Sequence, residues 1–197
     1  METITTKNIR NVCLLGHGGS GKTSLAESML YISKASERLG KITEGNTVCD
    51  SDPEEIKRGF SLSAAAAVLT WKDIKINILD APGYYDFEGE ARQCVRVADG
   101  AIIVVDGKAG IEVGTELAWD MATDAGLPKS FFINRFDDGE ARFYKVFTAL
   151  RERFGDEIGI AITNRNKKSG RKHYYTEETF RVLSFLERMR APKKRGV

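Results

Sequence analysis

Residues Gly16-His17-Gly18-Gly19-Ser20-Gly21-Lys22-Thr23 decide the fold of this chain of 197 residues. They fit the phosphate-loop pattern: a glycine, four residues, then glycine, lysine and serine or threonine. Residues 11–15 before the loop predict a short buried strand, and residues 23–32 after it predict a helix. In this context successive backbone N–H groups wrap around a phosphate at a helix N-terminus, where the helix dipole favours negative charge. The stretch therefore predicts a nucleoside triphosphate site, and a glycine-rich turn before a lysine is the alternative.

Two side chains of this loop carry specific chemistry. Lys22 would reach the outer phosphates, and the hydroxyl of Thr23 would bind Mg²⁺. We also include Ser24, the next residue of the expected helix, among the nucleotide-binding residues. The loop by itself does not determine which base is bound.

Composition and length are those of one α/β domain with a full core. The longest apolar runs, 64–69 and 101–105, are too short to cross a bilayer. The N-terminus lacks a basic segment followed by an apolar stretch, so we expect no signal peptide. Cys13, Cys49 and Cys94 have no metal-binding spacing, which is typical of a reduced protein. We therefore expect a cytoplasmic monomer without a membrane partner.

Strand and helix patterns alternate along the chain, which predicts an α/β fold. We expect a mostly parallel sheet with one antiparallel strand and helices on both faces, as in P-loop NTPases of the small-GTPase type. Residues 61–71 and 73–79 predict a hairpin, and residues 33–60 a long mobile loop. The other expected elements are strands over 101–105 and 130–133 and helices over 87–98, 112–125 and 143–154.

Asp80-Ala81-Pro82-Gly83 follows the second hairpin strand and fits the aspartate-x-x-glycine element of a nucleotide switch. Asp80 could hold a water on Mg²⁺, and the N–H of Gly83 could donate to a γ-phosphate. An ordinary turn is the alternative, because proline and glycine are common turn residues.

Asn134-Arg135-Phe136-Asp137 follows a strand and is similar to the asparagine-lysine-x-aspartate element that reads guanine. Asp137 could accept two hydrogen bonds from guanine that adenine cannot supply, and Asn134 could contact the base and brace the phosphate loop. Arg135 replaces the usual lysine, but its planar guanidinium can still lie over a base. Ligands of open α/β sheets bind at the carboxyl ends of the strands, where all three elements lie. Together the three elements therefore predict that the chain binds GTP or GDP. An ATP-binding P-loop protein of another lineage remains an alternative.

Several segments together resemble translation elongation factor G. They are Gly16-His17, the segment from Asp52 to Ser61, the segment from Asp80 to Phe87, Asp106-Gly107, Asn134 to Asp137, and residues 141–155. The resemblance covers residues 8–158 and is to the N-terminal GTPase domain of that factor only. It implies a Mg²⁺-dependent GTPase that acts on the ribosome to move tRNA and mRNA.

The chain departs from the family pattern at three site positions. Gly19 stands where the family has aspartate, a ligand of a monovalent ion. Ser61 aligns with a threonine that binds Mg²⁺, and the hydroxyl is kept. Tyr84 aligns with the histidine that orients the attacking water; a phenol with a pKa of about 10 cannot accept a proton as imidazole does. We assign Tyr84, Lys22 and Gly83 to catalysis and Thr23, Ser61 and Asp80 to Mg²⁺. These departures suggest a divergent, second-type subgroup of the family.

Residues 159–197 differ from the rest of the chain. They hold eleven Lys and Arg and three acidic residues, a net charge of +8, whereas residues 1–158 have a net charge of −6. We expect a GTP-binding domain over 1–158, in a truncated form of the factor. Over 159–197 we expect a basic extension with one helix that does not resemble the family. The basic end, Lys193-Lys194-Arg195, is either solvated or in contact with ribosomal RNA. A nucleotide-binding module with little hydrolysis, or a fragment of a ribosome-protection or release-type GTPase, is the alternative.

Overall fold

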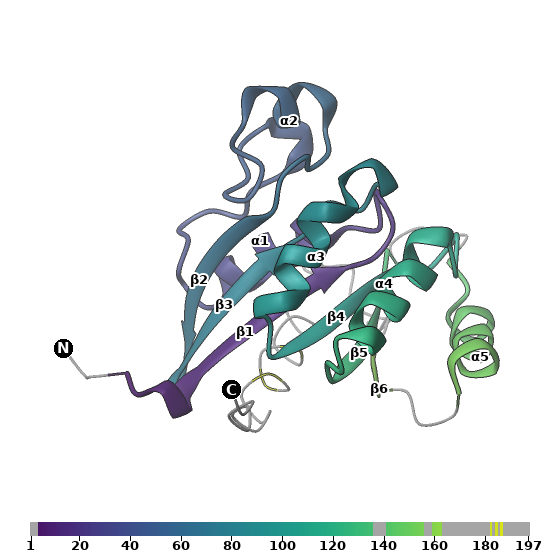
Figure 1. Ribbon diagram of the computed structural model, residues 1–197. Coiled ribbons are helices and arrows are strands. Elements are labelled where there is room, and N and C mark those ends of the chain that lie inside the picture. The colour runs from purple at the N-terminus through teal and green to yellow at the C-terminus, as the bar shows by residue number, and fades with distance from the viewer. Residues whose placement is uncertain are drawn as a thin grey trace, which may run out of the picture.

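The computed structural model describes residues 4–135 and 141–155, the backbone of residues 159–162, and the helical residues Val182, Ser184 and Leu186. Strands and helices alternate along the described chain (Figure 1). The strands are β1 (Ile9–Leu15), β2 (Ala65–Trp71), β3 (Ile74–Asp80), β4 (Gly100–Asp106), β5 (Lys129–Asn134) and β6 (Gly159–Ile162). The helices are α1 (Lys22–Ile32), α2 (Pro53–Arg58), α3 (Glu88–Val97), α4 (Val113–Asp124) and α5 (Phe143–Phe154).

The six strands form one sheet in the order β2-β3-β1-β4-β5-β6. β2 is antiparallel to β3, and all the other neighbours are parallel. The expected mixed sheet and its hairpin are therefore confirmed, although the first hairpin strand begins at Ala65 and not at residue 61. The sequence did not predict β6, which pairs with β5 in the register Ser130↔Gly159 and continues the sheet past residue 158.

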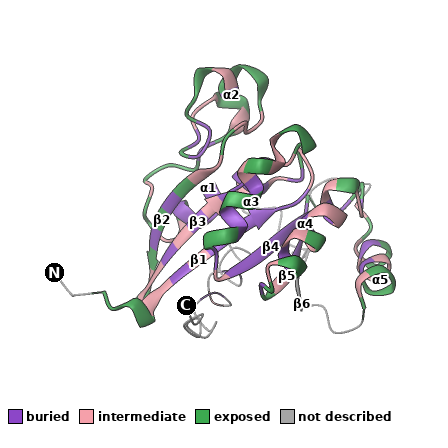
Figure 2. Cartoon of the chain, in the orientation of Figure 1, coloured by how far each residue is buried: buried purple, intermediate pink, exposed green. Residues whose placement is uncertain are grey.

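Both faces of the sheet are covered, as expected. Alternate β1 side chains point to opposite faces: Val12 and Leu14 pack with α1, whereas Cys13 and Leu15 pack with α3, α4 and α5. Every residue of β4 is buried, which is typical of a parallel strand between two helical layers (Figure 2). No helix of the described residues combines the length and the apolar character needed to cross a membrane.

Two residues of the C-terminal segment belong to the core. Val182 and Leu186 are helical and fully buried in the apolar cluster that also contains Leu25 of α1 and Ile76 of β3. They therefore pack on the same face of the sheet as α1. The expected basic end, residues 193–195, lies outside the described residues.

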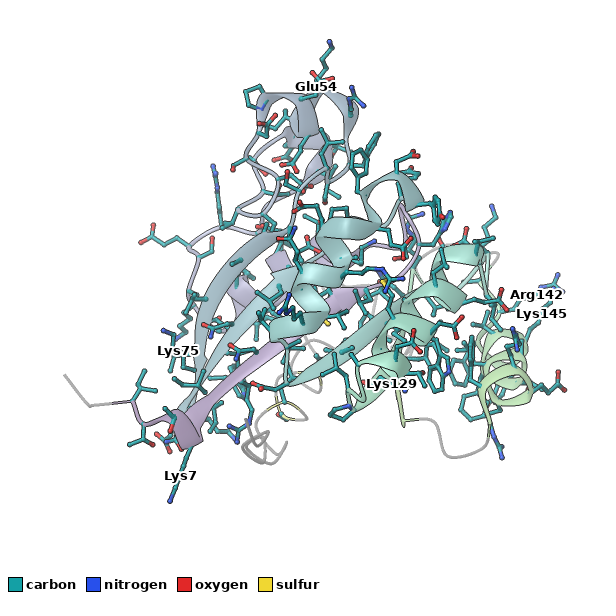
Figure 3. All side chains as sticks on the ribbon, in the orientation of Figure 1. Lys7, Glu54, Lys75, Lys129, Arg142 and Lys145 are labelled. Carbon is teal, nitrogen blue, oxygen red and sulfur yellow. The ribbon has the colours of Figure 1, made fainter. Side chains whose placement is uncertain are left out.

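The long segment between α1 and β2 was expected to be a loop but contains the helix α2. The side chain of Asp52 accepts a hydrogen bond from the N–H of Glu54, Pro53 occupies the first turn, and Gly59 ends α2 in the left-handed region (φ 72°). α2 projects beyond the sheet in Figure 1, and Glu54 points away from it in Figure 3. The expectation of an unbroken loop over 33–60 was therefore wrong.

Candidate nucleotide-binding site

The phosphate loop connects β1 to α1 at the carboxyl edge of the sheet. Gly16 and Gly21 have φ angles of 131° and 96°, which a residue with a side chain rarely adopts. A Cβ on Gly16 would also collide with the carbonyl oxygen of Val104, and one on Gly21 with the side-chain amide of Asn134. Backbone conformation and close packing thus both require glycine at these two positions.

The Lys22 ammonium lies inside the loop. Its Nζ donates to the carbonyl oxygens of Gly16 at 3.0 Å and His17 at 2.9 Å, and the side chain is buried. Burial lowers the pKa of Lys22 to about 8, although nearby carboxylates, Asp80 first among them, act in the opposite direction. A bound phosphate would favour the charged form of this lysine.

Asn134 connects the end of β5 to the phosphate loop. Its Nδ2 donates to the carbonyl oxygen of Ser20 at 3.0 Å, and the residue is 3% exposed. Asn134 is paired in register with Asp106 at the end of β4. The adjacent Arg135 has a φ of 61°, and its Nη1 lies 3.1 Å from Oδ2 of Asp106. Phe136 and Asp137, the rest of the expected guanine element, lie outside the described residues.

Three residues assigned to Mg²⁺ meet in one cluster. Oγ1 of Thr23 donates to Oδ2 of Asp80 at 2.7 Å and lies 3.3 Å from Oγ of Ser61. The Ser61 hydroxyl in turn donates to Oδ1 of Asp50 at 2.7 Å. Sequence reasoning missed Asp50, which lies in the long loop eleven residues before Ser61 without a motif around it.

The charges of this cluster are incompletely compensated. Burial raises the pKa of Asp80 to about 7, against the effects of its hydrogen bond from Thr23 and of Lys22; burial also raises the pKa of Asp50. Oδ1 of Asp80 and Oδ2 of Asp50 are buried and accept no hydrogen bond from the described residues. No group of three or more His, Cys, Asp and Glu that could hold a metal occurs in the described ranges, so hydroxyls must contribute. Two carboxylates and two hydroxyls are oxygen ligands of the kind that Mg²⁺ prefers, so the residues fit this ion.

The segment after Asp80 lies against the phosphate loop. Gly83 approaches the loop so closely that a Cβ there would be 2.7 Å from the backbone nitrogen of Gly18. The N–H of Ala81 donates to the carbonyl oxygen of Leu14 at 3.3 Å, which fixes the segment to β1. The Tyr84 side chain, 40% exposed, lies beside the ring of Phe60, with the ring centroids 4.7 Å apart.

A cavity of about 640 Å³ lies between the phosphate loop and the long loop. Its size suits a nucleotide. Predicted site residues that line it are Gly18, Gly19, Gly21, Lys22, Thr23, Ser24, Ser61, Gly83, Tyr84 and Arg135. The His17 side chain does not line it, because its Nε2 lies 3.5 Å from Oε1 of Glu112 and its Nδ1 accepts from the N–H of Gly114. Pro82 lines a neighbouring apolar cavity.

Comparison with known families agrees with this geometry. Residues 7–190 match the model of the elongation factor Tu GTP binding domain. The chain belongs to this family. The match includes the phosphate loop and the Asp80–Gly83 segment, and it continues past residue 158 to the buried helical residues Val182 and Leu186.

Individual relatives are translation factors. The chain is 37% identical to "Elongation factor G" of Granulibacter bethesdensis over 78% of its own length and 22% of the relative. It is 40% identical to mitochondrial "Ribosome-releasing factor 2" of Yarrowia lipolytica, over 79% of the chain and 20% of the relative. A crystal structure from Thermus thermophilus superposes with a TM-score of 0.73 at 40% identity, covering 76% of this chain and 22% of the other. This chain therefore has the GTP-binding domain of a translational GTPase and spans about a fifth of these relatives.

Proposed function

We propose that this domain binds GTP and GDP together with Mg²⁺ and hydrolyses GTP slowly on its own. The observation that carries the proposal is the juxtaposition of the Lys22 ammonium with the buried Thr23–Ser61–Asp80–Asp50 cluster on one cavity. A phosphate-binding cation beside unpaired carboxylate oxygens is what a Mg²⁺-nucleotide complex requires. When bound, Mg²⁺ would offset the charge of the phosphate oxygens.

The residues of this chain would stabilise the charge that develops during phosphoryl transfer. Lys22 and the loop N–H groups would bind the outer phosphates, and the N–H of Gly83 would donate to the γ-phosphate. Tyr84 would position the attacking water by a hydrogen bond. Because a phenol is a poor base at neutral pH, we expect slow intrinsic hydrolysis.

The base would be selected at the end of β5. The Asn134 bond to Ser20 and the position of Arg135 on the cavity support a base site beside the phosphate loop. We propose that Asp137 accepts the guanine N–H groups. The substitution Asp137→Asn should then shift preference from GDP to xanthosine diphosphate, and an unchanged preference would exclude this role.

Ribosome-stimulated hydrolysis is the proposal that the relatives support. One relative is named an elongation factor and another a ribosome-releasing factor, and both are far longer than this chain. A single-turnover GTP assay with and without ribosomes tests it, with Lys22→Ala as the inactive control. Faster turnover with ribosomes supports a GTPase. Tight GDP binding with no turnover under either condition would instead support a nucleotide-binding module, the alternative that the phenol at position 84 favours.

A further inference from the structure

The ring of Tyr84 lies directly on the backbone of Gly18. A Cβ built on Gly18 would be 2.7 Å from Cζ and 2.8 Å from both Cε atoms of that ring. Such separations are well below van der Waals contact, so no side chain fits at position 18 while the ring stays in place. Gly18 does not have the positive φ of Gly16, Gly19 and Gly21. The need for glycine at position 18 therefore comes from the tyrosine ring and not from the backbone.

Phe60 also contacts this ring. Its ring meets Tyr84 edge-on, with centroids 4.7 Å apart and an interplanar angle of 61°. Pairs of this geometry contribute stabilisation beyond their buried area. Phe60 immediately precedes Ser61, which belongs to the cluster proposed to bind Mg²⁺. The contact between Phe60 and Tyr84 therefore joins the segment around Ser61 to the segment that follows Asp80.

Tyr84 also borders two cavities. It lines the 640 Å³ nucleotide cavity and, with Pro82 and Met121, a more apolar cavity of about 220 Å³ between the phosphate loop, α3 and α4. Tyr84 and the neighbouring Gly83 both line the two cavities, so the ring lies at the border of the proposed phosphate site.

We propose that Gly18 is a positioning residue that seats the Tyr84 ring against the phosphate loop. This inference rests on the proposed function, because it concerns the same cavity. Positions 18 and 84 are then a coupled pair. A side chain at position 18 displaces the ring, and with it the hydroxyl proposed to position water.

A double-mutant cycle of Gly18→Ala and Tyr84→Ala, measured on the nucleotide-free protein, tests the seat. We expect Gly18→Ala to lower Tm by about 4 °C or more when Tyr84 is present and to have little effect in the Tyr84→Ala background. Gly19→Ala is the matched control. Gly19 has a φ of 80° and nothing within 4 Å of its Cβ position, so its cost should be the same in both backgrounds. Equal costs of Gly18→Ala in both backgrounds would overturn the proposal.

The single-turnover rate at saturating GTP tests the positioning role. Gly18→Ala should slow hydrolysis by about 10–100-fold, and the double variant should be no slower than Tyr84→Ala alone. A rate equal to wild type in Gly18→Ala, or additive losses in the double variant, would overturn the role. Failure of the wild-type chain to bind GTP would contradict the proposed function, whereas the Tm cycle would still decide whether Gly18 seats the ring.

Discussion

Replacing Asn134 with alanine should weaken both the fold and the phosphate loop. Its Nδ2 donates to the carbonyl oxygen of Ser20 at 3.0 Å, and Asn134 is only 3% exposed. Removing the amide leaves that carbonyl without its donor, which costs about 1–3 kcal/mol. If this bond holds the phosphate loop in its binding conformation, part of the lost free energy also appears as weaker binding. Each 1.4 kcal/mol lost from the binding free energy lowers the affinity for GDP about tenfold. We therefore expect GDP affinity to fall by about 10–100-fold.

Urea unfolding at 25 °C would give the loss of stability, and titration with fluorescent GDP would give the loss of affinity. Asn77→Ala is the matched control, because Nδ2 of Asn77 donates to Oδ1 of Asn11 at 2.7 Å and the residue does not line the cavity. We expect this control to lose stability but to keep its GDP affinity. Equal losses of GDP affinity in both variants, or a loss of stability below about 0.5 kcal/mol in Asn134→Ala, would contradict this role of the Asn134–Ser20 bond.

Three further outcomes follow from single contacts. Gly16→Ala should cost about 2–5 kcal/mol in urea unfolding, because a positive φ and a clash with the Val104 backbone add; a cost below about 1 kcal/mol would contradict the described loop. Glu27→Ala should speed tryptic cleavage between residues 33 and 60, because Oε1 of Glu27 accepts from the N–H of Val48 at 2.6 Å. The control Glu152→Ala, at an exposed position of α5 outside this loop, should not; equal rates would exclude the Glu27–Val48 bond as an anchor of the loop. Burial raises the pKa of Cys13 to about 12 and of Cys94 to about 11, so both thiols stay protonated at pH 8 and should react with Ellman's reagent only after unfolding; rapid reaction of native Cys13 would contradict its burial.

Local patterns were sufficient to predict five of the six strands and the edge of the sheet where the site lies. The alternation in residues 74–79 predicts the half-buried β3, and the apolar run 101–105 predicts the fully buried β4. Since parallel strands end at one edge, the motifs that follow them had to meet there. The meeting of Thr23, Asp80 and Ser61 follows from this arrangement and from the family resemblance.

What the sequence did not show depends on contacts between distant residues. Asp50 reaches the proposed Mg²⁺ site by accepting a hydrogen bond from Ser61, and no local sequence pattern specifies the path of the loop that carries it there. The seat of Tyr84 on Gly18 is invisible from either motif alone. In contrast, α2 had a readable signal: Asp52-Pro53 before it and Gly59 after it are common helix boundaries. β6 has only four residues, too few for an unambiguous periodicity.

One cavity is proposed to hold a guanine nucleotide together with Mg²⁺. Isothermal titration calorimetry of the whole chain with GDP and with ADP tests this most directly. In the presence of Mg²⁺ we expect saturable binding of GDP and affinity for ADP lower by at least about 100-fold, because a site built to hydrogen-bond guanine leaves its acceptors unpaired against adenine. Chelation of Mg²⁺ should lower the affinity for GDP. Equal affinity for the two nucleotides, or no binding of GDP, would contradict the account.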